Sequence, residues 1–338
     1  MPRISRRTIL KLGTSAVGAA MLAGCDGRRG TQWDVSLPWG PQEYHVLNAQ
    51  RFAAEVEQAT NGSLILNVHP GAVLGIKGPD TLRAVEEGIV DMAEASGFHQ
   101  VGAEPLLGLE SLPYLVDSID ELEVLYDVIR PAVEAAYARH GQRVVYIVPW
   151  PNQYFFLDQR IETAAQMRGL KMRTYDKLST DLVLNLGMTP VQMPTTDVVA
   201  ALAAGSLDAV MTSTTTAFAQ KYWDFLKYSF RTNHTWSCIV ESVNLQSLER
   251  LTPAERDALM GVARRLEPEF WDIARADDAD KLKELEANGM ETVIPSPDLL
   301  AEMRNQARPV VDAFIAQVPE SRALIAEFLA RVGRPMVS

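Results

Sequence analysis

The chain has 338 residues, 47% of them hydrophobic and 22% charged, which is typical of a soluble globular protein with about two domains. Its formal net charge is −11. An acidic surface of this kind repels phosphate backbones and anionic lipid headgroups, which argues against binding to nucleic acid or to a membrane surface.

The amino terminus has the features of an export signal. A basic segment that includes Arg6 and Arg7 precedes a short apolar stretch at 12–23. The stretch is too short to span a bilayer, so residues 1–24 are predicted to be a signal peptide rather than a transmembrane helix. The paired arginines within 5–11 resemble the twin-arginine signal, whose cargo crosses the membrane already folded.

The residues around the expected cleavage point resemble a bacterial lipobox. Leu22-Ala23-Gly24 precede Cys25, which predicts that Cys25 is acylated and becomes the first residue of the mature protein. A plain cleavage site beside a chance cysteine is the alternative. Residues 25–32 then form a linker. If Cys25 is lipidated, Cys238 has no partner for an internal disulfide, and we expect it to be a buried, inert thiol.

Predicted strands and helices alternate along the rest of the chain. A capping box at Thr252 and Glu255, with a proline at the first helical position, predicts a very long helix toward Gly289, kinked at Pro268. The alternation indicates an α/β fold with largely parallel sheets. The other predicted elements are strands at 33–38, 63–68, 89–95, 143–148 and 240–245, and helices at 42–59, 80–87, 118–140 and 299–331.

One spacing pattern occurs twice. The pattern D-x7-G-x2-D-x4-S begins at Asp80 and again at Asp197, each time as a helix, a glycine turn and a buried strand. It predicts two related lobes whose strands direct their carboxyl ends toward one shared crevice. Open α/β sheets bind their ligands in that position.

The sequence lacks the common catalytic and cofactor motifs. It has no G-x-S-x-G elbow, no H-E-x-x-H zinc helix, no P-loop and no G-x-G-x-x-G fingerprint, and its five histidines lack metal-ligand spacing. Together with the export signal and the two lobes, this favours a binding protein. We therefore expect no catalytic residue, no metal and no cofactor.

Five segments, in order, resemble the solute-binding subunit of tripartite ATP-independent periplasmic (TRAP) transporters. The resemblance runs from about Trp33 to about Leu251. It implies a two-lobed fold like that of periplasmic binding proteins, with a ligand cleft between the lobes and a long bridging helix. The segments are PGAVLG at 70–75, GIVDMA at 88–93, LPYL at 112–115, GLKMR at 169–173 and ALAAGSLD at 201–208.

The resemblance also implies a division of the chain and a set of partners. We assign 33–150 plus 239–278 to lobe I and 151–238 plus 279–338 to lobe II. A receptor of this family closes over one small organic acid in the periplasm and then docks on an ion-driven membrane permease. Contact with the membrane itself would come only through the lipid anchor.

The ligand site is implied by the same resemblance. In this family the arginine that ends the GLKMR segment pairs with a ligand carboxylate, and that position is Arg173 here. The alternatives are a surface or interlobe salt bridge for Arg173, a helix cap for Thr195 and a place in the core for Trp39. The other positions carried over by spacing are Trp39, Ser96, Phe98, His99, Gln153, Thr195 and Thr212.

The carried-over residues also predict the class of ligand. Gln153 stands where acidic-sugar receptors of the family have a second arginine, so sialic acid is not expected. A second buried carboxylate without a cation would cost several kcal/mol, which favours a small monocarboxylate with an apolar or aromatic body. A receptor that feeds a sensor system and a periplasmic enzyme are the alternative functions, and turnover would identify the enzyme.

Overall fold

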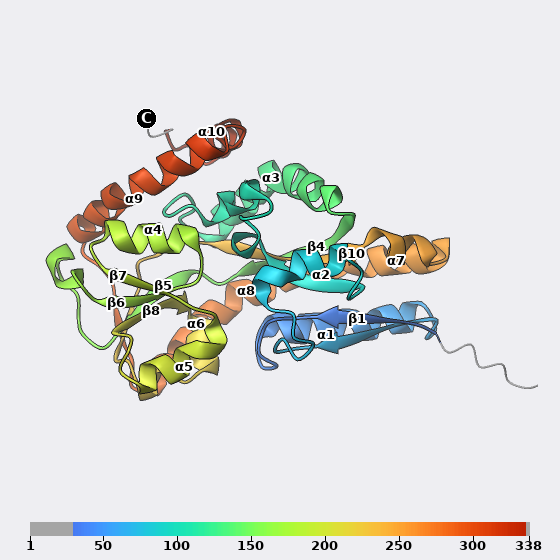
Figure 1. Ribbon diagram of the computed structural model, residues 1–338, viewed down its shortest axis with the longest axis horizontal. Helices are drawn as coiled ribbons and strands as arrows, with labels where there is room; N and C mark the ends of the chain where they lie inside the picture. The colour runs from blue at the N-terminus through green and yellow to red at the C-terminus, as the bar shows by residue number, and fades with distance from the viewer. Residues whose placement is uncertain (1–29, 336–338) are drawn as a thin grey trace, which may run out of the picture.

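The computed structural model describes residues 30–335, which form two lobes that lie side by side, each built on a β-sheet (Figure 1). The predicted signal peptide, twin-arginine motif and Cys25 lie outside the described residues.

The first sheet has the order β2-β1-β3-β10-β4 and the second has the order β11-β9-β5-β8-β6-β7. The strands of the first sheet are β1 (Thr31–Ser36), β2 (Leu64–His69), β3 (Met92–Ser96), β4 (Gln142–Trp150) and β10 (Ser237–Asn244). Those of the second are β5 (Gln153–Leu157), β6 (Lys171–Thr174), β7 (Thr189–Gln192), β8 (Ala209–Ser213), β9 (Tyr228–Phe230) and β11 (Glu291–Val293).

Both sheets are largely parallel, as predicted, but each contains one strand that runs against all the others. Strand β10 runs antiparallel to β3 and β4, and β5 runs antiparallel to β8 and β9. The physical reason is the path of the chain between the lobes. Strand β4 continues through Pro151 and Asn152 into β5, and β9 continues through 231–236 into β10. A strand that enters a sheet from the other lobe runs against the strands that begin within that sheet's own lobe.

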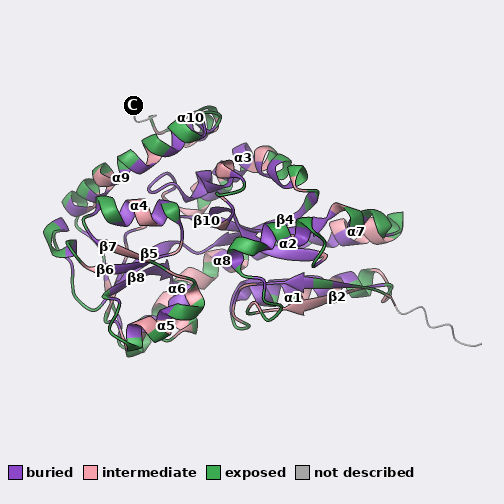
Figure 2. Ribbon diagram, viewed as in Figure 1, coloured by how far each residue is buried: buried purple, intermediate pink, exposed green. Residues whose placement is uncertain are grey.

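Helices cover both faces of each sheet. Alternate residues of β5 show this directly: Phe155 and Leu157 belong to one core, and Tyr154 and Phe156 belong to another. Strands β5, β8 and β10 are accordingly buried throughout, whereas the edge strands β2 and β7 are partly exposed (Figure 2). The helices are α1 (Tyr44–Ala59), α2 (Thr81–Glu86), α3 (Ile119–Arg139), α4 (Lys177–Asn185), α5 (Thr195–Ala203), α6 (Thr214–Ala219), α7 (Leu245–Arg250), α8 (Pro253–Ala287), α9 (Pro297–Gln317) and α10 (Ser321–Arg331). None of the helices in residues 30–335 combines the length and the apolar character needed to cross a bilayer.

The predicted long helix is confirmed as α8, which has 35 residues and bridges the lobes. Its capping box is present at Thr252, and Pro268 lies inside the helix; the kink expected there stays a prediction. Helix α8 packs against α1 and β4 in the first lobe and against α6 in the second. At the second contact, the hydroxyls of Thr214 and Thr215 donate to two successive aspartates of α8.

The repeated spacing marks equivalent positions in two β-α-β-α-β units. The units are β1-α1-β2-α2-β3 in the first lobe and β6-α4-β7-α5-β8 in the second. In the first, Oδ2 of Asp91 accepts a hydrogen bond from the backbone N–H of Asp34, 3.2 Å away. In the second, Oδ2 of Asp208 accepts one from the N–H of Lys171, 2.8 Å away. Each aspartate thus ties its own strand to the neighbouring parallel strand, which confirms the predicted pair of related lobes.

The C-terminal helices lie across both lobes. Helix α9 packs on α4 of the second lobe, whereas α10 packs on α3 of the first. Phe314 of α9 and Phe328 of α10 share a core with α3. The residue boundaries that we assigned to the lobes stay a prediction, and this segment shows why a boundary is hard to draw there.

A row of buried acidic side chains crosses the centre of the first sheet. Glu94 of β3 and Glu241 of β10 are cross-strand partners and are fully buried. The hydroxyl oxygen of Tyr146 lies 3.2 Å from Oε1 of Glu94 and 3.4 Å from Oε2 of Glu241. No cation in residues 30–335 pairs with either carboxyl. Burial raises the pKa of Glu94 to about 8 and that of Glu241 well above its usual value.

Candidate ligand-binding site

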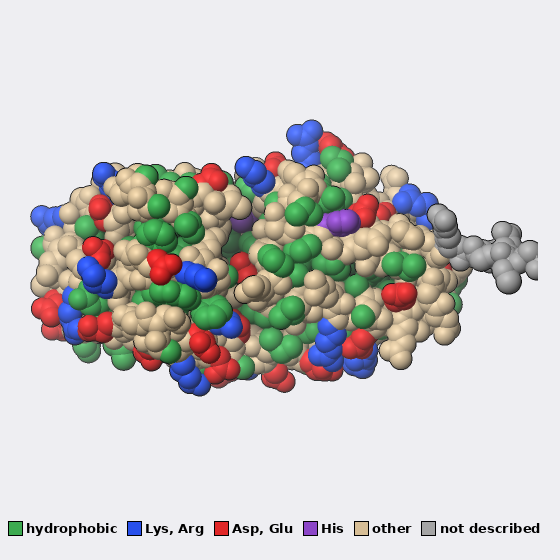
Figure 3. Space-filling model, turned by 90° about the horizontal axis from the view of Figure 1, so that it is seen from below, with side chains coloured by type: hydrophobic (Ala, Val, Ile, Leu, Met, Phe, Trp, Pro, Cys, Tyr) green, Lys and Arg blue, Asp and Glu red, His purple; other side chains and the backbone are tan. Residues whose placement is uncertain are grey.

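A cavity of about 740 Å³ lies between the two lobes, where Figure 3 shows a furrow on the lower face of the molecule. Most of its lining segments follow the carboxyl ends of strands, as the repeat predicts, and 219–221 lie at the end of α6. The wall of the first lobe comprises 38–43, 71–72, 77–80, His99 and Trp150. The wall of the second lobe comprises Arg173, Tyr175, 192–196, Thr216 and 219–221.

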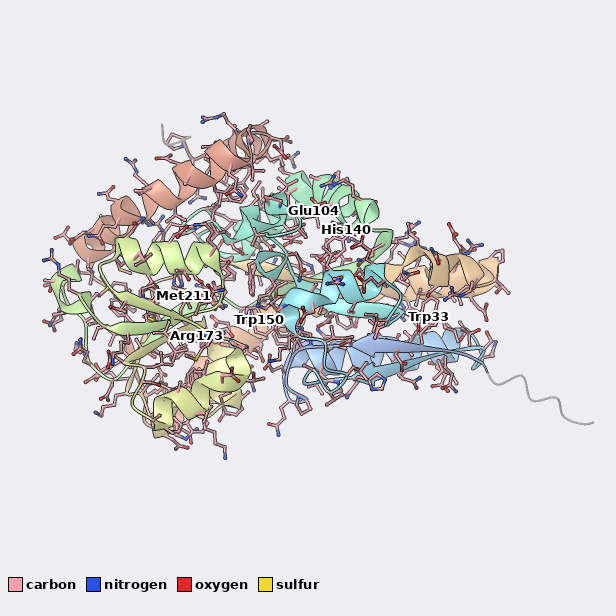
Figure 4. The ribbon with its side chains drawn as sticks, in the orientation of Figure 1. Trp33, Glu104, His140, Trp150, Arg173 and Met211 are labelled. Atoms are coloured by element: carbon pink, nitrogen blue, oxygen red, sulfur yellow. The ribbon has the colours of Figure 1, made fainter. Side chains whose placement is uncertain are left out.

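Arg173 is the buried cation of this cavity, with 3% of its surface exposed. Its Nε donates to the carbonyl of Met193 (3.1 Å), Nη1 to the carbonyl of Met211 (3.0 Å) and Nη2 to Oγ1 of Thr195 (3.0 Å). Figure 4 shows Arg173 and Met211 close together in the second lobe, with Trp150 toward the first. A guanidinium has five N–H groups, so one N–H on each terminal nitrogen remains for a ligand.

The charge of Arg173 has no partner within the described part of the chain. No Asp or Glu oxygen there lies within 4.0 Å of its nitrogens. Burial lowers its pKa because the charged form loses hydration, yet an arginine stays protonated in proteins. The Tyr175 ring, whose centroid lies 5.5 Å from the guanidinium carbon, offers only a cation–π contact. The cavity therefore holds a buried positive charge that an anion can neutralise through two parallel hydrogen bonds.

A chain of hydrogen bonds holds Thr195 in place beneath Arg173. Nε2 of Gln220 donates to the carbonyl of Thr195 (3.2 Å), and the hydroxyl of Tyr222 donates to Oε1 of Gln220 (3.0 Å). Thr195 is the first residue of α5, as predicted, but Pro194 occupies the cap position. The Thr195 hydroxyl accepts a hydrogen bond from Arg173 and does not cap the helix.

Aromatic rings form the wall of the first lobe. The ring centroids of Trp39 and Trp150 are 4.6 Å apart, and the His99 ring is nearly parallel to that of Trp39 at 6.5 Å. His99 packs directly over Gly78, where a Cβ atom would lie 2.4 Å from Nδ1 of the histidine. Burial lowers the pKa of His99 to about 3, so the ring is neutral at physiological pH. Lys77 also lines the wall of the first lobe, and its side chain is exposed.

Four residues carried over from sequence line the cavity together: Trp39, His99, Arg173 and Thr195. The other four lie behind its wall, and their contact with a ligand stays a prediction. Ser96 is fully buried in β3, and Thr212 pairs with Tyr154 inside the second sheet. Phe98 packs between His99 and Tyr175, and Nε2 of Gln153 donates to the carbonyl of Pro151.

Sequence reasoning missed several lining residues. Glu43 precedes α1 and Tyr175 follows β6. Thr216 lies within α6, and Gln220 follows that helix. Trp150 contributes both to the core of the first lobe and to the wall of the cavity. A position soon after a strand, as at Tyr175, was the available signal, but every strand end is followed by several such residues.

Comparisons with known proteins agree with this architecture. The family model "Bacterial extracellular solute-binding protein, family 7" (DctP) matches residues 36–317. The 2,3-diketo-L-gulonate-binding periplasmic protein YiaO of Escherichia coli is 23% identical over 284 residues, which cover 82% of this chain and 85% of YiaO.

Two solved structures are similar over most of their length. DctP7 of Bordetella pertussis, an extracytoplasmic solute receptor binding pyroglutamic acid, has a TM-score of 0.85 and 26% identity, and the match covers 88% of this chain and 99% of DctP7. A TRAP solute-binding protein from a marine metagenome, specific for pyroglutamate, has a TM-score of 0.84 and 26% identity, with 89% and 99% covered. The family match spans most of the sequence and the fold agrees with it. The chain therefore belongs to the DctP family of bacterial extracellular solute-binding proteins and is an extracytoplasmic solute receptor, not an enzyme.

Proposed function

We propose that the protein captures a small monocarboxylate in the cavity between its lobes and delivers it to a TRAP-type membrane permease. The observation that carries this proposal is the buried guanidinium of Arg173. It is fixed by three hydrogen bonds, it retains one N–H on each terminal nitrogen, and it has no carboxylate partner in residues 30–335. A ligand carboxylate supplies the missing charge and accepts both remaining hydrogen bonds.

The other lining groups favour a ligand with one carboxylate. Arg173 is the only buried cation among the lining residues, since His99 is neutral and both Lys77 and Lys221 are exposed. The wall of the first lobe offers tryptophan rings to an apolar body. The similar proteins support the same class, because pyroglutamate and 2,3-diketo-L-gulonate each carry one carboxylate.

We expect monocarboxylates to bind more tightly than C4-dicarboxylates by about a hundredfold or more, because a second carboxylate would be buried without a cation. The measurement is one calorimetric series with pyroglutamate, 2-oxo acids and 2-hydroxy acids beside succinate and malate. Thermal unfolding provides a rapid screen, since a ligand at a hundred times its Kd adds about 2.7 kcal/mol of stability. A dicarboxylate that binds tightest, at micromolar affinity or better, would contradict this class of ligand.

A receptor for a sensor system is the alternative, because it would bind the same ligand in the same cavity. Transport distinguishes the two. Proteoliposomes that contain the permease subunits should accumulate the labelled ligand only when this protein is added. A ligand that binds tightly but is never transported would favour the sensor.

We also propose that the protein is exported by the twin-arginine route and anchored through Cys25 to the outer face of the cytoplasmic membrane. The basis is the sequence around Arg6, Arg7 and Cys25. A labelled fatty acid should be incorporated into the wild type, which should fractionate with membranes. Cys25→Ala should take up no label and should not be retained there. Equal solubility of both proteins without label would contradict the anchor.

A further inference from the structure

Glu43 is an acidic residue on the opposite wall of the cavity from Arg173. It precedes α1 in the first lobe, only 6% of its surface is exposed, and its side chain does not cap the helix. Oε1 accepts one long hydrogen bond, 3.4 Å, from the backbone N–H of Gly40. Oε2 has no hydrogen-bond partner in the described chain. The carboxyl group therefore lacks most of the donors that a buried carboxylate needs.

The groups that face Glu43 from neighbouring elements do not compensate for this lack. They are Asp277 on α8, Glu94 on β3, Tyr44 at the start of α1 and Tyr222 from the second lobe, and none of them is a cation. Within residues 30–335 no Lys, Arg or His nitrogen lies within 4.0 Å of the carboxyl. Burial raises the pKa of Glu43 to about 7, with the charge of Asp277 adding to the effect.

We propose that Glu43 is a second ligand contact, whose carboxylate accepts a hydrogen bond from an N–H or O–H group of the ligand and so selects acids that carry such a donor. The inference rests on the proposed function, in which Arg173 holds the ligand carboxylate. A ligand of this kind contacts both lobes at once, with its carboxylate on the second lobe and its donor on the first. The ligand donates the hydrogen bond that no group within residues 30–335 donates to Oε2 of Glu43. Such a ligand should therefore bind more tightly than an acid without a donor.

The proposal makes the pH dependence of binding depend on the ligand. A ligand donor stabilises the charged form of Glu43 and lowers its pKa on binding, so binding releases a proton. Because the free protein has a pKa of about 7 at Glu43, affinity rises with pH and levels off above 7. The affinity should be about tenfold weaker at pH 6 than at pH 8. A 2-oxo acid has only acceptors, requires the protonated carboxyl, and should show the opposite trend.

The test is a calorimetric titration at pH 6, 7 and 8 with L-pyroglutamate, lactate and pyruvate. Lactate and pyruvate form a matched pair, since they differ in a hydroxyl donor against a keto acceptor. Wild type should show the roughly tenfold gain for pyroglutamate and lactate and the reverse for pyruvate. Glu43→Gln cannot ionise and should show a flat profile for all three. Glu57→Gln, which changes an exposed acid on the same helix, should keep the slopes of the wild type.

Two outcomes separate this inference from the proposed function. If Arg173→Ala binds as well as wild type, or if none of the acids binds, the proposed function fails. If Arg173→Ala loses binding while Glu43→Gln keeps the slopes, only the role of Glu43 is overturned. Should Glu43→Gln fold poorly, wild type alone decides the matter by titration at pH 7 in two buffers of different ionisation enthalpy. A release of about half a proton per pyroglutamate supports the inference, and no proton exchange overturns it.

Discussion

Replacing Arg173 with alanine should abolish ligand binding while the fold is retained. Removing one partner of a desolvated charge pair costs about 3–5 kcal/mol, because the other charge is left buried and unpaired. The affinity should therefore fall by roughly two to three and a half decades. Arg173→Lys should also bind worse than wild type, because an ammonium group cannot present two parallel N–H donors to one carboxylate.

Calorimetry with the tightest monocarboxylate measures this loss, and thermal unfolding without ligand tests the fold. Loss of the hydrogen bonds to Met193, Met211 and Thr195 is offset by removal of a buried, unpaired charge. Arg168→Ala is the matched control, because Arg168 is an exposed arginine just before the same strand. Near-normal affinity in Arg173→Ala would rule out its role as the anchor.

The free energy of unfolding should fall as the pH rises from 6.5 to 8.5. Burial raises the pKa of Glu94 and of Glu110 to about 8 and that of Glu241 well above its usual value. In this window the folded protein holds protons that the unfolded chain has lost, so stability decreases with pH. Each such group contributes up to about 1.36 kcal/mol per pH unit.

Buried histidines limit this trend at lower pH. Burial lowers the pKa of His45, His99 and His234 to about 3, so below pH 6.5 the unfolded chain binds protons that the folded protein does not. Stability contributed by these rings is lost as the pH falls through that range. Between about pH 4.5 and 6.5 the two sets of groups therefore oppose each other, and the decrease of stability with pH is steepest above pH 6.5.

Urea unfolding at pH 6.5, 7.5 and 8.5 measures the alkaline side of this profile. The double variant Glu94→Gln/Glu241→Gln should show a shallower decrease than wild type, because amides stay neutral at every pH. Glu249→Gln, an exposed acid outside the first sheet, should leave the slope unchanged. A free energy of unfolding that increases from pH 6.5 to 8.5 would contradict the prediction.

The sequence predicted the elements well because their signals are local. The capping box at Thr252 identifies the start of α8, and the twofold spacing pattern identifies two related units before any contact is known. The antiparallel strands could not be predicted in the same way. Nothing local distinguishes β10 from a strand that begins within its own lobe, since its direction depends on the position of the preceding strand, β9, in the other sheet.

The candidate site shows the same limit at the scale of single residues. Spacing identified the correct segment after β3, but of the neighbours Phe98 and His99 only the histidine lines the cavity. In the strands themselves, adjacent side chains point to opposite faces, so an offset of one residue exchanges cavity for core. Glu43 was missed because what distinguishes it is a buried carboxyl group with too few hydrogen-bond donors around it. This lack can be recognised only when all the residues packed around Glu43 are known.

The crossing of strands between the lobes has a consequence for biosynthesis. Strand β4 pairs only with β10, and Tyr146 and Glu241, which face each other in that pair, are 95 residues apart in sequence. The second sheet in turn is complete only with β11, which ends at Val293. When the ribosome has made the first 150 residues, β4 has no strand beside it, so the first sheet cannot be completed until β10, which ends at Asn244, has been made. Both sheets are therefore completed by long-range strand pairings, which form slowly and leave sheet edges open to aggregation until they close.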